Sequence, residues 1–272
     1  MTAVLPAAPA ALEPPVEEPT EGRLLAVLSP KGGVGKTTLA ASVAAALAAD
    51  HPGGVVLVDA DLQFGDVAAV LDMEPERTLP DLVAGPIGHD DLILKTLLEQ
   101  HASGPFVVCG ARSPEEGDRV SPEQLGALLS GLRRGFRWVV VDTTPALGEH
   151  TLAVLDRASD ALAVSSLSVP GLRALRTELA VLTRIGFRPR TLTCVLNQVG
   201  PAAGLTEADA ARILERRIDA VVPHSRAVAV ATNRGVPVVV ERPRDRASRA
   251  IARLVKHLDG AATRRTAGGS RA

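Results

Sequence analysis

Short runs of leucine and β-branched residues alternate along the chain with longer segments in which apolar residues recur every three to four positions. The short runs predict buried strands, and the longer segments predict helices that cover them. Strand patterns occur near 24–29, 55–59, 106–110, 137–142, 161–166, 191–197, 218–222 and 236–240. Helical patterns occur near 36–49, 65–71, 90–101, 122–134, 149–157, 171–185, 206–216, 225–233 and 246–258. This alternation predicts an α/β fold, with a mostly parallel twisted sheet of about seven to eight strands and helices on both faces.

The two ends of the chain differ in composition from the region between them. Residues 1–22 are rich in Ala, Pro and Glu and contain no Lys or Arg, which predicts a disordered tail. Residues 261–272 are predicted to form a flexible basic tail, and 242–272 hold nine Arg or Lys against two Asp. Such a basic end favours anionic lipid or nucleic acid, or it is a solvated tail. Because no linker or repeat interrupts 23–260, a single domain is predicted there.

Composition and motif content exclude several classes of protein. The chain is 46% hydrophobic but only 2% aromatic, so its core must be packed mainly with Ala, Val and Leu. Its two cysteines, Cys109 and Cys194, lie in apolar runs and form no CxxC pair, which argues against disulfides and a bridging iron–sulfur site. No signal-peptide pattern and no apolar run of about 18 residues is present, so a cytoplasmic protein without a membrane span is expected. The six histidines lack metal-ligand spacing, and there is no Gly-x-Ser-x-Gly motif of a serine hydrolase.

The most informative segment, Ser29–Thr38, reads Ser-Pro-Lys-Gly-Gly-Val-Gly-Lys-Thr-Thr. It joins a predicted strand to a predicted helix, which is the context of a phosphate-binding loop. The glycines let successive backbone N–H groups turn toward one anion, and the helix N-terminus adds donors and partial positive charge. Lys36 is expected to reach the β- and γ-phosphates of a nucleotide, and the Thr37 hydroxyl to bind Mg²⁺. An ordinary glycine-rich turn is the alternative.

Carboxylates close two of the predicted strands. Asp59 and Asp61 follow one apolar run, and Asp142 ends another. The carboxyl ends of parallel strands face the crevice in which open α/β sheets bind ligands, so these acids are expected to meet there. A buried strand that ends in Asp142 matches the Walker B pattern, and a carboxylate that holds a Mg²⁺-bound water suits the coordination that magnesium prefers. The alternative for Asp61 is a cap on the helix that follows.

One departure from the general loop is also informative. Pro30 stands where the first glycine is usual, and a second lysine, Lys31, follows it. This arrangement resembles the deviant Walker A loop of the MinD/ParA superfamily of P-loop ATPases, and the resemblance extends over roughly residues 23–258. It implies a single-domain P-loop NTPase fold that uses ATP and Mg²⁺ and hydrolyses ATP slowly without a partner. Lys31 is then expected to cross the interface of an ATP-dependent homodimer and to touch the phosphates of the partner's ATP.

The same resemblance assigns roles to further residues. Asp59 is expected near Mg²⁺, and Asp61 is expected to orient the attacking water. Asn197, which from the residues alone is a cap or turn residue, is expected to hydrogen-bond the adenine edge, and Pro223 to line the base pocket. The predicted catalytic residues are Lys31, Lys36 and Asp61, and the predicted metal-binding residues are Thr37, Asp59 and Asp142. The predicted nucleotide-binding residues are Lys31, Gly32, Gly33, Val34, Gly35, Lys36, Thr37, Thr38, Asn197 and Pro223.

Two positions depart from the family pattern, and three stretches indicate which branch of the family the chain resembles. Thr144 stands where many relatives have a proline, and His224 stands where they carry an acidic or polar residue. The stretches Asp61–Val67, Ala111–Glu116 and Ser168–Arg173 resemble the CpaE/TadZ branch and a related septum-site-determining group. The first of these groups helps to localise pilus-secretion machinery.

The resemblance therefore implies an ATP-dependent dimerisation switch for spatial positioning, with an unidentified protein partner. A ParA-like DNA-segregation ATPase and a metabolic or carrier ATPase on the same fold stay open as alternatives. The surface to which the switch attaches is open as well: peripheral attachment to the inner face of the cell membrane and non-specific DNA binding would use the same basic residues. An apolar stripe near the C-terminus either packs on the sheet or forms a membrane-binding helix; it comprises Ile251, Leu254, Val255 and Leu258.

Overall fold

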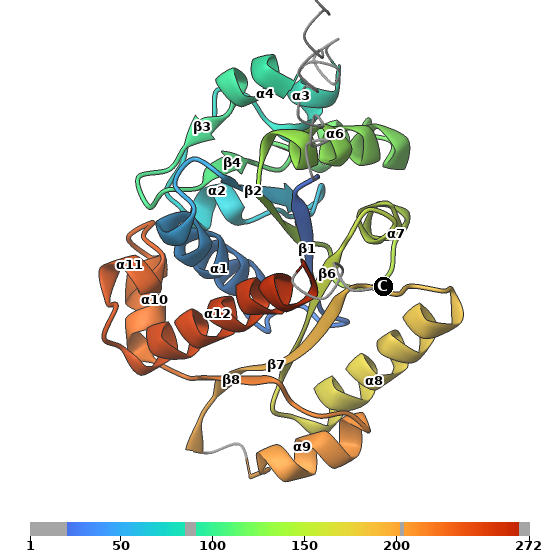
Figure 1. Ribbon diagram of the computed structural model, residues 1–272, viewed down its shortest axis with the longest axis vertical. Coiled ribbons are helices and arrows are strands. Elements are labelled where there is room, and N and C mark those ends of the chain that lie inside the picture. The colour runs from blue at the N-terminus through green and yellow to red at the C-terminus, as the bar shows by residue number, and fades with distance from the viewer. Residues whose placement is uncertain (1–20, 85–90, 202–203, 267–272) are drawn as a thin grey trace, which may run out of the picture.

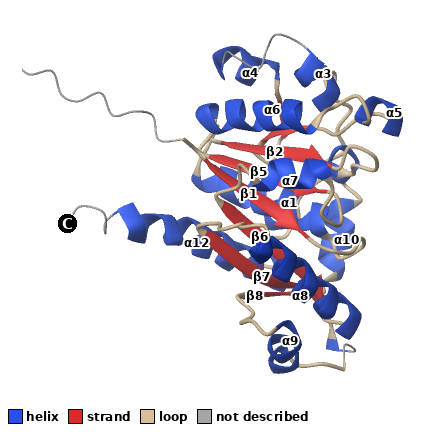
Figure 2. Ribbon diagram, turned by 90° about the vertical axis from the view of Figure 1, so that its right-hand side faces the viewer, coloured by secondary structure: helices blue, strands red, loops and turns tan. Residues whose placement is uncertain are grey.

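A twisted sheet runs through the centre of the molecule, with helices on both of its faces (Figure 1, Figure 2). The computed structural model describes residues 21–84, 91–201 and 204–266. Within these ranges the sheet has eight strands in the order β3-β4-β2-β5-β1-β6-β7-β8, and each neighbouring pair is parallel except β3 and β4. The strands are β1 (Arg23–Leu28), β2 (Val55–Ala60), β3 (Glu99–Gln100), β4 (Phe106–Val108), β5 (Trp138–Thr143), β6 (Asp160–Ser166), β7 (Thr191–Val199) and β8 (Ala220–Pro223).

Each central strand is buried on both faces, which explains why its sequence is a continuous apolar run rather than an alternating one. Along β1, Leu24 and Leu28 belong to one hydrophobic cluster, whereas Leu25 and Val27 belong to the cluster on the opposite face. The cluster of Leu24 includes residues of α6 (Pro122–Gly135), α8 (Val169–Arg184) and α9 (Glu207–Leu214). The predicted α/β architecture with helices on both faces is thus confirmed.

The opposite cluster, that of Leu25, is formed by the long N- and C-terminal helices. It includes residues of α1 (Lys36–Asp50), α10 (Arg226–Thr232), α11 (Val238–Glu241) and α12 (Arg246–Thr266). Five shorter helices complete the described residues: α2 (Val67–Val70), α3 (Leu79–Ala84), α4 (Asp91–Leu97), α5 (Pro114–Gly117) and α7 (Glu149–Leu155). Several begin where the sequence predicts, and Ser121 forms a capping box with Gln124 ahead of α6.

The structure differs from the sequence prediction at a few short elements. The strand predicted near 236–240 is wrong, because Val238–Glu241 form the short helix α11. Gly235 precedes it with φ of +68°, and Pro237 is its N-cap, so the backbone turns where a strand would have to extend. The helix predicted near 90–101 is wrong at its end, because α4 ends at Leu97 and Glu99–Gln100 form the short strand β3, paired with β4. The pattern gave no sign of α3 and α5.

The C-terminal helix α12 packs on the same face of the sheet as α1. The apolar stripe of α12 is buried, with exposures of 3% or less for Ile251, Leu254, Val255 and Leu258. The stripe is therefore committed to the core rather than to a membrane. The helix runs to Thr266, past the point near 258 at which the sequence pattern ended it. In the described part of the chain, no helix combines the length and hydrophobicity that a bilayer span needs.

The parallel strands end at one edge of the sheet, here called the carboxyl edge. The loops that leave β1, β2, β5, β6 and β7 all emerge there, and β1 lies between β5 and β6. In Figure 2 the arrows of β1 and β2 point to this edge, where α5 and α10 also lie. The loop at 29–35 and the strand-end acids are thus brought together by the topology itself.

Candidate functional site

The loop after β1 places a lysine among oxygen atoms at the carboxyl edge. Lys36 is 8% exposed, and its Nζ donates to Asp142 Oδ1 at 2.7 Å and to the carbonyl oxygen of Thr143. The Thr37 hydroxyl donates to the other oxygen of the same carboxylate, Asp142 Oδ2, at 2.6 Å. The predicted loop residues and the predicted Walker B acid therefore form one connected cluster.

The first turn of α1 is open to an anion. Gly35 is the N-cap of α1 with φ of +78°, and it has no side chain to bond the first N–H groups of the helix. A Cβ built on Gly32 or Gly33 would meet no other atom within 4 Å, so the outer side of the loop faces open space. Unpaired N–H groups and the positive end of the helix dipole together make a site for phosphate oxygens.

Two buried carboxyl groups face the loop from adjacent strands. Asp59 and Asp142 are register partners on β2 and β5, and each is 1% exposed. Burial, with the neighbouring Asp142 charge as the second cause, raises the pKa of Asp59 to about 8. Burial also raises the pKa of Asp142, although Lys36 and Thr37 oppose that change. Lys36 pairs with Asp142, and Asp59 has no cationic partner among the described residues, so a divalent cation at this position would stabilise the ionised forms of both acids.

The donor set beside Thr37 fits magnesium rather than a metal held wholly by side chains. Within the described ranges no group of three or more His, Cys, Asp or Glu side chains is placed to hold a metal ion. Magnesium in nucleotide sites takes one or two protein oxygens and fills its other positions with phosphate oxygens and water. A threonine hydroxyl with two nearby carboxylates matches that requirement.

The loop after β2 is built around Asp59 and Asp61. The two oxygens of Asp59 accept hydrogen bonds from the backbone N–H groups of Asp61 at 3.1 Å and Val67 at 3.0 Å. Asp61 Oδ1 in turn accepts from the N–H of Phe64 at 3.1 Å. Asp61 is half-buried, and its hydrogen bonds in the described structure lie within this loop, so its predicted role toward water stays a prediction.

Asn197 lies against the phosphate-binding loop. It is 6% exposed, and its Nδ2 donates to the carbonyl oxygen of Val34 at 2.8 Å and that of Gly35 at 3.4 Å. The amide nitrogen therefore ties the end of β7 to the loop, a structural role that the sequence did not suggest. Its predicted contact with adenine stays a prediction.

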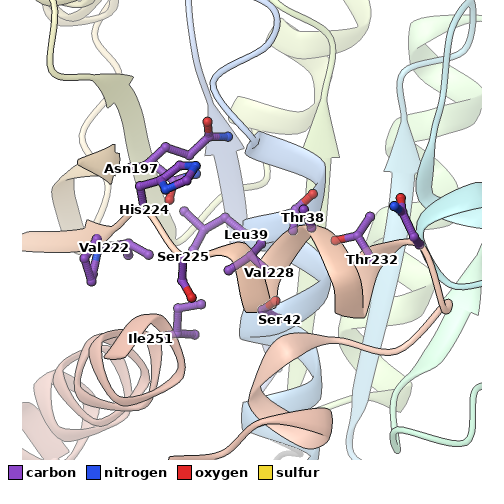
Figure 3. A pocket seen from close by; sticks show the side chains of 14 residues that line it. Thr38, Leu39, Ser42, Asn197, Val222, His224, Ser225, Val228, Thr232 and Ile251 are labelled. Atoms are coloured by element: carbon purple, nitrogen blue, oxygen red, sulfur yellow. The ribbon is translucent and has the colours of Figure 1, made fainter. Parts of the chain in front are cut away.

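A cavity of about 310 Å³ opens beside Asn197 and the first turns of α1 (Figure 3). Its walls combine apolar side chains with hydroxyl and amide groups, which is the usual character of a small-molecule pocket. Pro223, predicted to line a base pocket, and Thr38, predicted to bind nucleotide, both line this cavity, and His224 lies near Asn197 at one end. The remaining lining residues are Leu39, Ser42, Gln198, Val222, Ser225, Val228, Ala229, Thr232, Asn233 and Ile251.

Some of these lining residues carry polar groups that the sequence did not single out. Ser42 is 1% exposed, and its Oγ has no hydrogen-bond partner in the described structure. Gln198 has φ of +57°, and a Cβ on Gly35 would come within 2.5 Å of its Nε2. Gln198 directly follows Asn197, which is the one signal that was available, whereas Ser42 lies in an ordinary helical pattern.

Lys31 is the predicted site residue that the structure leaves apart from the cluster. Its side chain is exposed, and no hydrogen bond or ion pair of its ammonium group occurs within the described residues. Its backbone carbonyl and N–H both bond the Ser29 hydroxyl. The lysine side chain is thus exposed on a loop whose first turn is held by the Ser29 hydroxyl.

Comparison with known proteins agrees with this geometry. Residues 25–238 match the family model described as the CobQ/CobB/MinD/ParA nucleotide-binding domain. The chain belongs to this family. The septum site-determining protein MinD of Thermotoga maritima is 26% identical over 224 residues, which are 80% of this chain and 81% of that protein.

Two solved structures of proteins named MinD share the fold of this chain. The cell division ATPase MinD of Pyrococcus furiosus superposes with a TM-score of 0.77 at 26% identity, over 88% of this chain and 99% of that one. The Pyrococcus horikoshii septum site-determining protein MinD, complexed with Mg-ADP, has a TM-score of 0.76 at 23% identity, over 88% and 96% of the two chains. The predicted MinD/ParA membership and P-loop NTPase fold are confirmed, and the predicted cofactors, ATP and Mg²⁺, agree with the family and with that complex.

Proposed function

We propose that this protein is a magnesium-dependent ATPase of MinD/ParA type, which uses ATP to switch between a monomer and a homodimer. The observation that carries the proposal is the cluster of Lys36, Thr37 and Asp142 beneath an uncapped helix N-terminus. Phosphoryl transfer needs positioned cations and backbone donors more than covalent chemistry, and this cluster supplies both.

The loop holds the triphosphate, and the strand-end acids hold the metal. The backbone N–H groups from Gly32 to Thr38 face the phosphates, and Lys36 leaves Asp142 to reach the β- and γ-phosphate oxygens. The Thr37 hydroxyl binds Mg²⁺, while Asp59 and Asp142 act on it directly or through its waters. When bound, the metal neutralises charge that develops on the phosphate oxygens. The base enters the cavity lined by Pro223 and Asn197.

Hydrolysis is slow in the monomer because two parts of the machinery are incomplete. Asp61 orients the attacking water, but in the monomer one of its carboxylate oxygens accepts a hydrogen bond from the Phe64 N–H of its own loop. Lys31 neutralises phosphate charge only on a second copy, since its own side chain is exposed. A dimer or a protein partner therefore raises the rate by completing the charge around the γ-phosphate.

The biological role that fits such a switch is spatial positioning at a surface or partner inside the cell. The loops after β2 and β5, which carry Asp61 and follow Asp142, would take one arrangement around γ-phosphate and Mg²⁺ and another after hydrolysis, and that change would release the partner. The T. maritima and P. furiosus relatives are septum-site and cell-division proteins, which supports positioning. The finer assignment to the CpaE/TadZ branch rests on the three stretches noted above.

The alternative functions have less support. A metabolic ligase needs an insertion for its second substrate, whereas this chain matches 99% of a MinD chain over 88% of its own length. Membrane insertion through the last helix is disfavoured, because Ile251 and Leu258 are buried. The basic C-terminal region keeps both anionic lipid and DNA as candidate surfaces.

Turnover and molecular mass, measured with and without Mg-ATP, test the proposal. The parent should hydrolyse ATP slowly and dimerise with ATP but not with ADP. Lys31→Ala should bind ATP and fail to dimerise, and Asp61→Ala should accumulate as the ATP-bound dimer. A parent chain that turns over ATP as a monomer, unaffected by either substitution, contradicts the switch. Co-sedimentation with anionic liposomes and with duplex DNA then identifies the surface.

A further inference from the structure

Two of the large apolar side chains that the structure exposes lie at the carboxyl edge, on opposite sides of the phosphate-binding loop. Phe64, in the loop after β2, is 77% exposed, and Val169, at the start of α8 after β6, is 36% exposed. A phenylalanine in that position is unusual in a chain with only four Phe, one Trp and no Tyr. Exposed single apolar residues are common, so exposure alone does not mark a contact surface.

The Phe64 and Val169 side chains cannot contact each other within one copy. Strands β2 and β6 are separated by β5 and β1 in the sheet, a distance of about 14 Å at ordinary strand spacing. The loop that carries Lys31 emerges between them, from β1. A second copy that meets this edge about a two-fold axis perpendicular to the sheet, midway between β2 and β6, would bring Phe64 of each chain over Val169 of the other.

The charges around the two positions are opposite. Three exposed acids lie on the Phe64 side of the edge, namely Asp66, Glu115 and Asp118. Two exposed bases, Arg112 and Arg119, flank α5, and Arg112 is already paired with Asp81 and Glu116. Arg173 is exposed beside Val169 on the first turns of α8, and neither it nor Asp66 has an ion-pair partner in the described structure. A two-fold contact places the acidic side of one copy on the basic side of the other, which is the self-complementary pattern that an isologous interface requires.

We infer that Phe64 anchors the ATP-dependent homodimer by packing against Val169 of the second copy, with Asp66 facing Arg173 of that copy. The inference rests on the proposed function, because that function supplies the ATP-dependent dimer. The inference adds the contact that holds the two copies together and the hydrogen bonds that connect this contact to Asp61. The connection is short: the Phe64 N–H bonds Asp61, and Asp61 bonds Asp59 through its own N–H. Docking of Phe64 therefore fixes the carboxylate that orients water.

The first test measures the dissociation constant of the dimer by sedimentation velocity, in the presence of a non-hydrolysable ATP analogue and Mg²⁺. Phe64→Ala should raise it about tenfold or more, because the lost anchor occurs twice per dimer. Ile185→Ala is the matched control, since Ile185 is 56% exposed at the other end of α8. Nucleotide affinity of the monomer should be unchanged in both variants. At protein concentrations where the parent is dimeric, Phe64→Ala should also lose turnover.

Charge reversal and cross-linking test the geometry of the contact. Asp66→Arg and Arg173→Asp should each weaken the dimer, and the double variant should recover most of the loss. A chain with both Phe64→Cys and Val169→Cys should be cross-linked by a short bismaleimide only with the ATP analogue, because the native Cys109 and Cys194 are each 2% exposed. Phe64→Cys alone and Ile185→Cys with Phe64→Cys should not cross-link.

The outcomes separate this inference from the proposed function. A parent that dimerises with ATP while Phe64→Ala dimerises equally well overturns the inference and leaves the proposed function standing. Cross-linking of Phe64→Cys with itself also overturns it, because the two phenylalanines would then meet each other. A parent that does not dimerise with nucleotide overturns both.

Discussion

Gly65 offers a direct way to disturb the loop after β2 without touching a charged group. A Cβ on Gly65 would lie 2.4 Å from Asp59 Oδ2 and 2.7 Å from the carbonyl oxygen of Asp61. The φ angle of Gly65 lies outside the left-handed region, so alanine is allowed by the backbone itself. The whole effect of Gly65→Ala is therefore steric, and it falls on the carboxylate that faces the proposed metal position.

The loss of stability in Gly65→Ala depends on whether Asp59 or the loop after β2 moves to relieve the clash. Asp59 is buried and held by two N–H groups, so the exposed loop must withdraw from it by several tenths of an ångström. Crowding of this kind costs about 1–3 kcal/mol. Loss of the hydrogen bond from Val67 N to the buried Asp59 adds about 1–3 kcal/mol if the bond breaks outright and leaves a buried polar group unsatisfied. Since an exposed loop relaxes, we expect about 2 kcal/mol of lost stability. Turnover should fall by about 100-fold, because Asp61 moves with the loop.

Three measurements on Gly65→Ala separate these effects: the free energy of unfolding, ATP affinity and the rate of hydrolysis. ATP affinity should change little, because the phosphate-binding loop lies on β1. Gly54→Ala is the matched control, since Gly54 lies just before the other end of β2 and its nearest neighbouring atom would be 3.4 Å away. If Gly65→Ala hydrolyses ATP at the parent rate with parent stability, the proposed packing of the loop on Asp59 is wrong.

Two further predictions concern stability. Asp160 is fully buried, and its oxygens accept from Arg23 at 3.0 and 2.5 Å. Asp160→Asn should therefore cost about 3–5 kcal/mol in urea unfolding, because the Arg23 charge loses its only carboxylate partner among the described residues. A loss below about 1 kcal/mol contradicts this. Burial raises the pKa of Glu178 from 4.5 to about 7, so its penalty is absent below pH 4.5 and complete above pH 7. The parent should thus lose on the order of 3 kcal/mol of unfolding free energy across that window, and Glu178→Gln should remove the loss, whereas the exposed Glu207→Gln should not. Equal pH profiles for parent and Glu178→Gln would refute the burial argument.

The site core could be predicted from the sequence because its parts are local. The order of strand, glycine loop and helix specifies the surroundings of Lys36 within about ten residues of chain. Asp59 and Asp142 needed one additional rule, that parallel strands end at a common edge. The observed bonds from Lys36 and Thr37 to Asp142 agree with that reasoning.

The remainder depends on contacts between distant segments. The Asn197 amide bonds the carbonyl of Val34, which is 163 residues away, and no local pattern encodes that pairing. The Val-rich run at 238–240 has strong strand propensity, yet Val238 is buried against the helices on one face of the sheet and the run forms α11. Tertiary packing overrides propensity in such short segments.

Calorimetric titration with Mg-ATP tests the central claim most directly, because it measures whether the loop and its acids bind a nucleotide at all. The parent should bind one ATP per chain, and Lys36→Gln, which keeps a donor toward the Thr143 carbonyl but no positive charge, should lose most of the affinity while its circular dichroism spectrum stays that of the parent. Saturable binding of ATP that is equally tight in Lys36→Gln, or no heat from ATP in the folded parent, would contradict the account.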